Sequence, residues 1–305
     1  MKLFDLHCDT ITVLEEQGKQ LFANDLQVSL ERAADYDAFA QIFAVFIPDT
    51  LRGQAAVAYF DRVHAFYEKQ MQKNSDLIFS YFDSKDTKMK AILSVEGGAA
   101  AAGTIEGLRH LSDCDVRLMT LTWNAQNEIA SGCWAEPDTG LTAFGINALR
   151  EMERLSMVAD VSHLSKRGFW DVAEHAKKPF VASHSNCDLT ENEYGRRRNL
   201  DDAQIRCLVE RGGLMGINLC PDFLGDKGDA SFDAVYRHIS HALDTGAEHI
   251  LAMGCDLDGC DPLPELAAVE KLRDIYEYLL SKNMNEALCE RIFYGNADKF
   301  FGSLA

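Results

Sequence analysis

The sequence lacks the features that mark membrane-spanning, disulfide-stapled or nucleic-acid-binding proteins. No apolar run approaches the roughly 18 residues that a bilayer-spanning helix needs. The nine cysteines show neither zinc-finger pairing nor the density of a small disulfide scaffold, so we expect buried thiols in a reducing compartment. No basic cluster exceeds Arg196-Arg197-Arg198, and the formal net charge is -18. Because nucleic-acid binding depends on neutralising phosphates, this charge balance argues against it.

Other missing features reduce the number of possible fold classes and cellular locations. No Gly-x-Gly-x-x-Gly follows a predicted strand, which removes the usual support for a dinucleotide-binding fold. A candidate active-site histidine stands at position 7, which leaves no room for a cleavable leader, so we expect a cytoplasmic protein without a membrane anchor. Nothing resembles a linker in the 305 residues, of which 47% are hydrophobic and 26% charged. We therefore expect one domain over residues 1–305.

The segment from Met157 to Ser185 is the clearest structural unit. An apolar run ends in Asp160-Val161-Ser162-His163, an amphipathic segment covers residues 165–176, and a second apolar run ends at His184. A strand, a helix and a second strand form a βαβ unit, whose crossover makes the two strands parallel. We therefore expect His163 and His184 at the same end of one sheet, where they can share a ligand.

The rest of the chain repeats this alternation. Besides the two strands of that unit, strands are predicted over residues 3–6, 39–47, 90–95, 116–122, 213–219 and 250–255. Helices are predicted over residues 55–71, 105–111, 143–155, 165–176, 201–210, 232–243, 266–280 and 286–293. Alternation implies a parallel sheet, and eight strands favour closure into a single α/β barrel of the (β/α)8 TIM type. The last helices would pack on this barrel.

Polar residues follow the carboxyl ends of the predicted strands. They are His7, Asp9, Glu96, His163, His184 and Asp256. In a barrel these ends meet on one face, where such enzymes place their sites. Three imidazoles with two or three carboxylates suit two borderline cations such as zinc, with one carboxylate bridging. A bridging hydroxide would be the nucleophile near neutral pH, and Asp256 would pass its proton to the leaving amine.

Each of these residues also has a plain structural interpretation, because a single histidine in an apolar context usually only packs. The metal hypothesis rests on several residues at corresponding positions and on the His7-x-Asp9 spacing, which puts both side chains on one face of a strand. The remaining histidines fall in or beside predicted helices and are expected to be surface or packing residues: His64, His110, His175, His238, His241 and His249. A metal site at His238 and His241, three residues apart, is the less favoured alternative.

Six motifs together resemble the membrane (renal) dipeptidase family, peptidase family M19. They are His7-Cys8-Asp9, Ser94-Val95-Glu96-Gly97-Gly98, Asp160-Val161-Ser162-His163, Ser183-His184-Ser185, Arg198-Asn199-Leu200 and Gly254-Cys255-Asp256-Leu257-Asp258-Gly259. They occur in the order that the family has. The resemblance implies a metal-dependent hydrolase barrel with two zinc ions. One ion would be held by His7, Asp9 and Glu96, and the other by Glu96, His163 and His184.

The resemblance also implies two substrate-directed roles. Asp256 would be the proton shuttle, and Arg198 would hold the C-terminal carboxylate of a dipeptide, which a planar guanidinium can meet with two hydrogen bonds. The alternative for the three arginines is solvated loop charge, and only Arg198 precedes the Asn-Leu of the motif. Family members often accept a D-residue on the C-terminal side, and they frequently form homodimers.

The sequence departs from the better-known mammalian members at one position. Where these have a histidine after Leu-Thr at the end of the fourth strand, this chain has Trp123-Asn124. The hypothesis is that Trp123 or Asn124 lines the substrate pocket and changes specificity; the alternative is a tryptophan that only packs at the barrel rim. We also expect the protein to differ from the mammalian members in having neither their secretory leader nor their lipid-anchor signal.

The predicted function is a zinc-dependent dipeptidase that acts on small dipeptides. The main alternative is a deacylase of N-acyl amino acids on the same metal barrel, because a fold does not dictate its substrate. A metal-dependent deoxyribonuclease is disfavoured by the acidic composition and by His-x-Asp in place of His-x-His. A non-catalytic scaffold would be expected to lack ligands, and none is missing.

Overall fold

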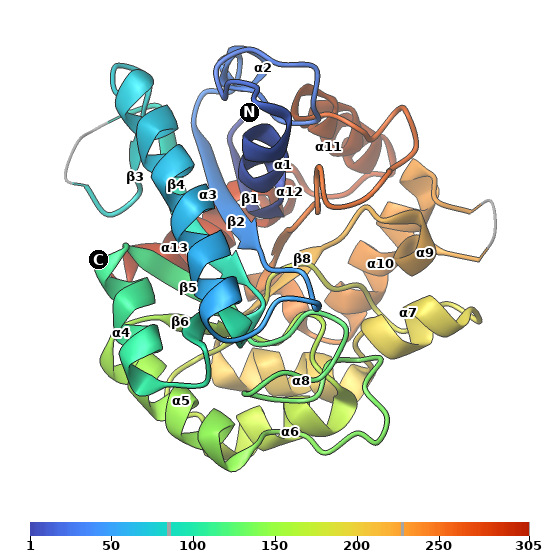
Figure 1. Cartoon of the computed structure of the whole chain (residues 1–305). Coiled ribbons are helices and arrows are strands. Elements are labelled where there is room, and N and C mark those ends of the chain that lie inside the picture. The colour runs from blue at the N-terminus through green and yellow to red at the C-terminus, as the bar shows by residue number, and fades with distance from the viewer. Residues whose placement is uncertain (84–86, 227–228, 305) are drawn as a thin grey trace.

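Parallel strands close into a barrel in the computed structural model of the chain, which describes residues 1–83, 87–226 and 229–304 (Figure 1). The strands follow the order β2-β1-β9-β8-β7-β6-β5-β4-β3, and a further pairing between β2 and β4 closes the ring. Their bounds are β1 Leu3–Cys8, β2 Phe39–Phe46, β3 Ile78–Ser80, β4 Met89–Glu96, β5 Val116–Thr120, β6 Val158–Asp160, β7 Val181–Ala182, β8 Leu214–Ile217 and β9 Leu251–Met253. The predicted (β/α)8 barrel is confirmed, with every strand of the ring at an expected position.

The strand β3 was not predicted. It pairs with the first residues of β4, from Met89 to Ala91, and β5 pairs with the later ones, from Leu93 to Glu96. The strand has three residues, of which two are half-buried. So short a segment shows no alternation of apolar and polar residues, which explains why the sequence pattern did not indicate it.

Helices surround the barrel in the expected alternation. The long ones are α1 Thr10–Gln17, α3 Gln54–Lys73, α4 Ile105–Asp113, α5 Ala143–Arg154, α6 Lys166–His175, α8 Asp202–Arg211, α10 Phe232–Asp244 and α11 Leu272–Ser281. The short ones are α2 Leu30–Ala33, α7 Glu193–Arg198, α9 Pro221–Leu224, α12 Glu286–Glu290 and α13 Asn296–Gly302. Of these, α1, α2, α7, α9 and α13 were not predicted.

The helix predicted to begin at Leu266 begins instead at Leu272, after a 3-10 turn over Val269–Lys271. The Val269 amide donates to the Gln27 carbonyl oxygen at 2.8 Å. The chain before α11 is therefore held by a long-range backbone contact rather than by helical hydrogen bonds, which a sequence pattern cannot reveal.

Two apolar clusters support the barrel. The larger one lies between strands and helices, with Phe43, Val95 and Met253 packed among residues such as Phe60 and Ile275. The smaller one gathers the alternate strand residues, which point inward because side chains alternate along a strand. It contains Phe4, Leu6, Ala40, Ile42, Ile92, Leu118, Val158, Val181, Leu214 and Ala252, together with Phe301 of α13. The helix α13 therefore covers the amino-terminal end of the barrel and leaves the carboxyl-terminal end for a site.

The cysteines are all free thiols, and six of them are buried. Cys114, Cys207 and Cys260 are partly exposed, so the expectation of buried thiols holds for most of the set rather than for all of it. Among the residues that the structure describes, no helix is long and apolar enough to cross a membrane.

Candidate metal centre

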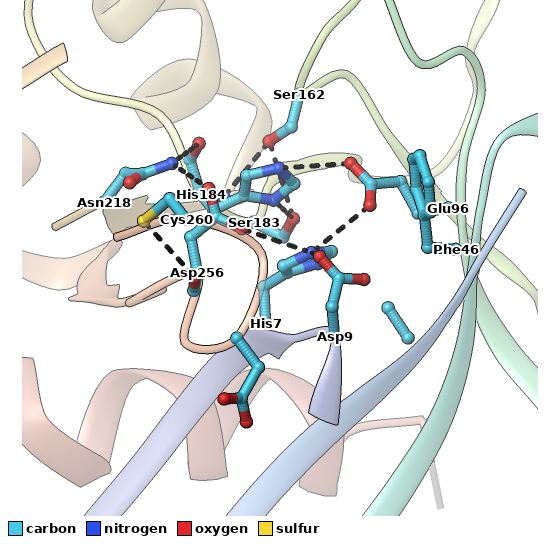
Figure 2. A network of polar contacts seen from close by, with 12 residues as sticks. His7, Asp9, Phe46, Glu96, Ser162, Ser183, His184, Asn218, Asp256 and Cys260 are labelled. Atoms are coloured by element: carbon cyan, nitrogen blue, oxygen red, sulfur yellow. Dashed lines mark hydrogen bonds and ion pairs between the residues drawn. The ribbon is translucent and has the colours of Figure 1, made fainter. Parts of the chain in front are cut away.

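The predicted ligands lie together at the carboxyl end of the barrel, where Figure 2 shows His7, Asp9, Glu96 and His184 and where His163 contacts Glu96. Glu96 is the last residue of β4, Asp9 directly follows β1, and His184 follows β7 by two residues. His7 lies inside a bulge of β1, where the pairing with β2 shifts between Asp5 and Cys8. Such bulges re-aim a side chain, and they are common beside active sites.

The two oxygens of Glu96 face different histidines. Its Oε2 lies 3.6 Å from His7 Nε2, and its Oε1 lies 3.0 Å from His163 Nε2 and 3.6 Å from His184 Nε2. His7 Nε2 also lies 3.7 Å from Asp9 Oδ2. The carboxylate of Glu96 therefore stands between two groups of side chains, as a bridging ligand does.

Asp256 lies in the group that contains His7 and Asp9, with its Oδ1 3.8 Å from His7 Nε2. Asp256 and His163 both have left-handed backbone conformations, with φ of 61° and 63°. Non-glycine residues rarely adopt this conformation, and it clusters at functional sites. A β-carbon on Gly259 would lie 2.2 Å from Asp9 Oδ2 and 2.4 Å from Asp256 Oδ1, so only glycine lets this loop pass so close to the carboxylates.

The chemistry of the donor set fits metal ions. Donor atoms of His7, Glu96 and His184 lie within 4.8 Å of one another, as do those of His7, Asp9 and Asp256. Both ring nitrogens of His7 and the Oδ1 of Asp9 are buried, and none of the described residues forms a hydrogen bond with them. A buried polar atom without a partner costs free energy. A cation among the carboxylates would meet Asp9 and the Nε2 of His7, which lies 3.6 to 3.8 Å from Glu96, Asp9 and Asp256.

Burial and the closeness of like charges raise the pKa values of two acidic side chains at this site. Burial, reinforced by Asp9, raises the pKa of Glu96 to about 7. Burial likewise raises the pKa of Asp256 to about 6, against the lowering effect of His7. Burial, together with Arg198, holds the pKa values of His163 and His184 well below their usual range. Neutral imidazoles are the form that binds metal ions.

The outer nitrogens of His163 and His184 have protein partners. His163 Nδ1 lies 2.9 Å from Asn124 Oδ1, and His184 Nδ1 lies 2.7 Å from Ser183 Oγ. Partners of this kind orient the ring of a metal-binding histidine. Asn124, which was expected to line the substrate pocket, does border the cavity, but its carbonyl oxygen is directed at the back of His163.

A cavity of about 410 Å³ opens over these residues. Its lining includes Trp123 and Arg198 as well as Phe46, Trp134 and Tyr194. Trp123 packs edge-on against Phe46, with ring centroids 5.0 Å apart. The hypothesis that Trp123 borders the pocket and the alternative that it packs at the rim therefore both describe part of its environment.

Arg198 is buried beside the cavity, at the end of α7, with 4% of its surface exposed. It donates from Nη2 to the His184 carbonyl oxygen at 3.0 Å and from Nη1 to Ser185 Oγ at 3.2 Å. Its Nε has no hydrogen-bond partner within the described part of the chain. By contrast, Arg197 pairs with Glu136 and Glu193 on the surface, as solvated charge does.

Three buried polar residues of the site were not assigned a role from the sequence. Asp160 accepts hydrogen bonds behind His184, Ser183 stands between the two, and Asn218 donates to Asp256 Oδ2 at 2.9 Å. Asp160 and Ser183 belong to quoted motifs, but neither borders the cavity, and their contacts come from neighbouring strands. Asn218 directly follows β8, a strand-end position that offered a usable signal.

A second cavity, of about 460 Å³, lies around the amino-terminal ends of β6, β8 and β9, where Val158, Leu214 and Phe300 line it. It is larger than the cavity over Glu96 but mostly apolar. Because the cluster of titratable groups with shifted pKa values borders the smaller cavity, the smaller one is the candidate site.

Comparison with known structures agrees with this architecture. A solved dipeptidase described as a family M19 metallopeptidase has a TM-score of 0.89 and 22% identity, covering 100% of this chain and 98% of the other. A Rhodobacter sphaeroides metallopeptidase, liganded with a phosphinate mimic of the dipeptide L-Ala-D-Ala, has the same score, identity and coverage. At this identity the likeness shows a common fold.

Sequence comparison shows the family. An uncharacterized protein from the pqqA 5' region of Klebsiella pneumoniae is 31% identical over 222 residues, which is 70% of this chain and 81% of that protein. An uncharacterized dipeptidase of Schizosaccharomyces pombe is 35% identical over 197 residues, 62% of this chain and 46% of its own length. Residues 1–304 match the membrane dipeptidase family. The predicted resemblance and the predicted enzyme class, a metallo-dipeptidase, are thus confirmed, and the chain belongs to the membrane dipeptidase family, peptidase family M19.

Proposed function

We propose that this protein hydrolyses the peptide bond of small dipeptides with two divalent metal ions, zinc being the expected one. The observation that carries the proposal is the arrangement around Glu96, whose two carboxylate oxygens face separate groups of histidines beside a cavity that also contains a buried arginine. This arrangement combines a place for metal ions with a place for a substrate carboxylate.

The ligand sets follow from the two sides of Glu96. His7, Asp9 and Glu96 would hold one ion, and Glu96, His163 and His184 would hold the other. Ions bound by these residues would activate a water molecule and polarise the scissile carbonyl. Among the described residues, His7 Nε2 and Asp9 Oδ1 have no hydrogen-bond partner, which supports this assignment, because a cation would satisfy both.

Arg198 would bind the C-terminal carboxylate of the substrate. It lies beside the cavity, it is buried, and its Nε has no protein partner. Because Arg198 and Glu96 line the same cavity, a substrate whose terminal carboxylate is bound there would be short, which favours dipeptides over longer chains. The L-Ala-D-Ala mimic in the Rhodobacter sphaeroides relative supports a dipeptide substrate, including one with a D-residue on the C-terminal side.

Asp256 would move the proton. Its Oδ2 accepts from Asn218, while its Oδ1 remains directed toward His7, on the side where the ions would bind. A raised pKa of about 6 suits a group that takes a proton from water and hands it to a leaving amine near neutral pH.

The test is a dipeptide panel of mixed stereochemistry, assayed with zinc, manganese and cobalt. We expect L,L or L,D dipeptides to be cleaved and the corresponding dipeptide amides to be resistant, because an amide removes the charge that Arg198 would bind. Cleavage of N-acetyl amino acids in place of dipeptides would establish the deacylase alternative. Two bound ions without hydrolysis of any substrate would refute the enzymatic function.

Trp123 is proposed to set part of the side-chain specificity, because it borders the cavity in the place of the mammalian histidine. Replacing it with alanine should change kcat/KM unequally across the panel. Equal rates for wild type and Trp123→Ala on every dipeptide would leave Trp123 with a packing role only. The expected homodimer and the cytoplasmic location remain predictions.

A further inference from the structure

Asp160 is a buried carboxylate that borders neither the cavity nor the proposed ions, yet it receives four hydrogen bonds. The Ser162 and Ser183 amides donate to its Oδ1 at 3.0 and 2.9 Å. The Thr120 and Ser183 hydroxyls both donate to its Oδ2 at 2.6 Å. All four residues lie on or directly after β5, β6 and β7, with at most 1% of their surface exposed.

The Ser183 hydroxyl connects this carboxylate to His184. Its oxygen lies 2.6 Å from Asp160 Oδ2 and 2.7 Å from His184 Nδ1. A hydroxyl carries one hydrogen, and a carboxylate has none to give. Ser183 therefore donates to Asp160 and must accept from His184, which places the ring hydrogen on Nδ1.

We propose that Asp160 is a positioning residue that sets the tautomer of His184 through Ser183, so that Nε2 presents a lone pair to a metal ion. Figure 2 shows His184 facing Glu96, and its Nε2 lies 3.6 Å from Glu96 Oε1. The same nitrogen lies 3.0 Å from His163 Nε2, on the side where an ion would bind. The inference rests on the proposed function, in which His184 is a metal ligand.

The substitution Asp160→Asn tests the direction of this relay, because it keeps the shape of the side chain and reverses its polarity. Two backbone amides face Oδ1, so the carbonyl oxygen of the asparagine must stay there. Its NH₂ group then faces the two hydroxyls and donates to Ser183. The Ser183 hydroxyl turns to donate to His184 Nδ1, which moves the ring hydrogen to Nε2 and blocks that nitrogen.

The measurement is the affinity for each divalent ion, obtained by competition with a chromophoric chelator and from the visible absorption of bound Co²⁺. We expect Asp160→Asn to lower the affinity for one of the two ions by about 10- to 100-fold. Ser183→Ala removes the relay without reversing it, so this variant should lose less metal affinity than Asp160→Asn. The double variant Asp160→Asn/Ser183→Ala should bind like Ser183→Ala, because no hydroxyl remains to transmit the reversal.

Thr120→Val is the matched control, since it removes another hydroxyl from the same carboxylate oxygen and leaves the relay intact. It should bind both ions nearly as wild type does. Far-UV circular dichroism and thermal unfolding of all variants establish that they are folded.

Two results would overturn the inference. The first is that Asp160→Asn binds both metal ions as tightly as the wild type does. The second is that the double variant binds them more weakly than Asp160→Asn does, which would indicate packing damage only. If the wild-type protein itself binds no divalent ion, the proposed function fails. If the wild type binds two ions and Asp160→Asn binds them equally well, only the role of Asp160 fails.

Discussion

The two sides of the metal centre are held in place by different means. On the side of β6 and β7, the outer nitrogens of His163 and His184 each contact a protein partner, Asn124 and Ser183. On the side of β1, neither ring nitrogen of His7 has a hydrogen-bond partner among the described residues; its ring stacks on that of His184, with centroids 3.8 Å apart. One side is preorganised by hydrogen bonds, whereas the other is positioned by packing and a strand bulge.

A bound cation is therefore expected to order the β1 side, with His7 and Asp9, more than the side of β6 and β7. A histidine held by hydrogen bonds keeps its orientation whether or not an ion is present. His7 and Asp9 instead lie beside Glu96, whose pKa is raised to about 7 by burial and by the charge of Asp9, and a bound cation would offset both effects.

Metal removal should have the largest effect. Chelation with EDTA is expected to abolish dipeptide hydrolysis, because the nucleophile and the carbonyl polarisation both depend on the ions. Hydrogen exchange should then rise over residues 5–13 and change little over residues 160–164 and 181–185. An equal rise in hydrogen exchange on both sides after chelation would contradict the expected asymmetry. Readdition of zinc is the control for reversible loss.

Asp256→Asn should lower kcat by about 10²- to 10⁴-fold, because it removes a positioned proton-transfer group. The metal content should stay near that of the wild type, since the amide keeps the shape of the side chain. Asn218→Ala, which frees Asp256 Oδ2, should lower kcat much less. A full loss of metal in Asp256→Asn would instead make Asp256 a ligand on the His7 side.

His238 is a third kind of buried histidine, with both ring nitrogens satisfied by the backbone. Its Nε2 donates to the Leu224 carbonyl oxygen at 2.8 Å, and its Nδ1 accepts from the Cys187 amide at 3.2 Å. Its expected packing role thus agrees with its contacts. Burial lowers its pKa to about 4.

Acid should therefore destabilise the protein through His238. The unfolded chain binds a proton below about pH 6.5, whereas the folded chain does so only near pH 4. Stability present above pH 6.5 is thus lost as the pH falls through this window, by about 3 kcal/mol for a shift of roughly 2.5 units. Urea unfolding at pH 7.5 and pH 4.5 should show a smaller pH dependence in His238→Gln. An unchanged pH dependence would exclude His238 as the cause.

Asn124→Ala should produce the smallest of these effects, about a 10-fold loss of affinity for one ion, because His163 loses its outer partner. Asn124→Asp, which keeps an acceptor facing Nδ1, should bind like the wild type. If Asn124→Ala changes only the KM of the substrate and leaves metal affinity unaltered, Asn124 acts in the pocket, as first expected from the sequence.

Much of the site could be predicted because strand ends and ligands coincide. Glu96, His163, His184 and Asp256 all follow apolar runs, and a parallel barrel brings such positions to one face. The contacts around Asp160 were not predictable in this way, because they join three neighbouring strands. The bulge at His7 depends on a local shift in pairing with β2, which an apolar run does not reveal.

By itself, the sequence determined the alternation of strands and helices, the family and the set of ligand-type side chains, because these depend on local periodicity and on residue identity. Only the tertiary structure decided which nitrogen of each histidine faces the others, that Arg198 is buried while Arg197 is not, and that Asn124 is directed at His163. These properties depend on side-chain orientation and on hydrogen bonds between segments far apart in the chain, and no local pattern records either.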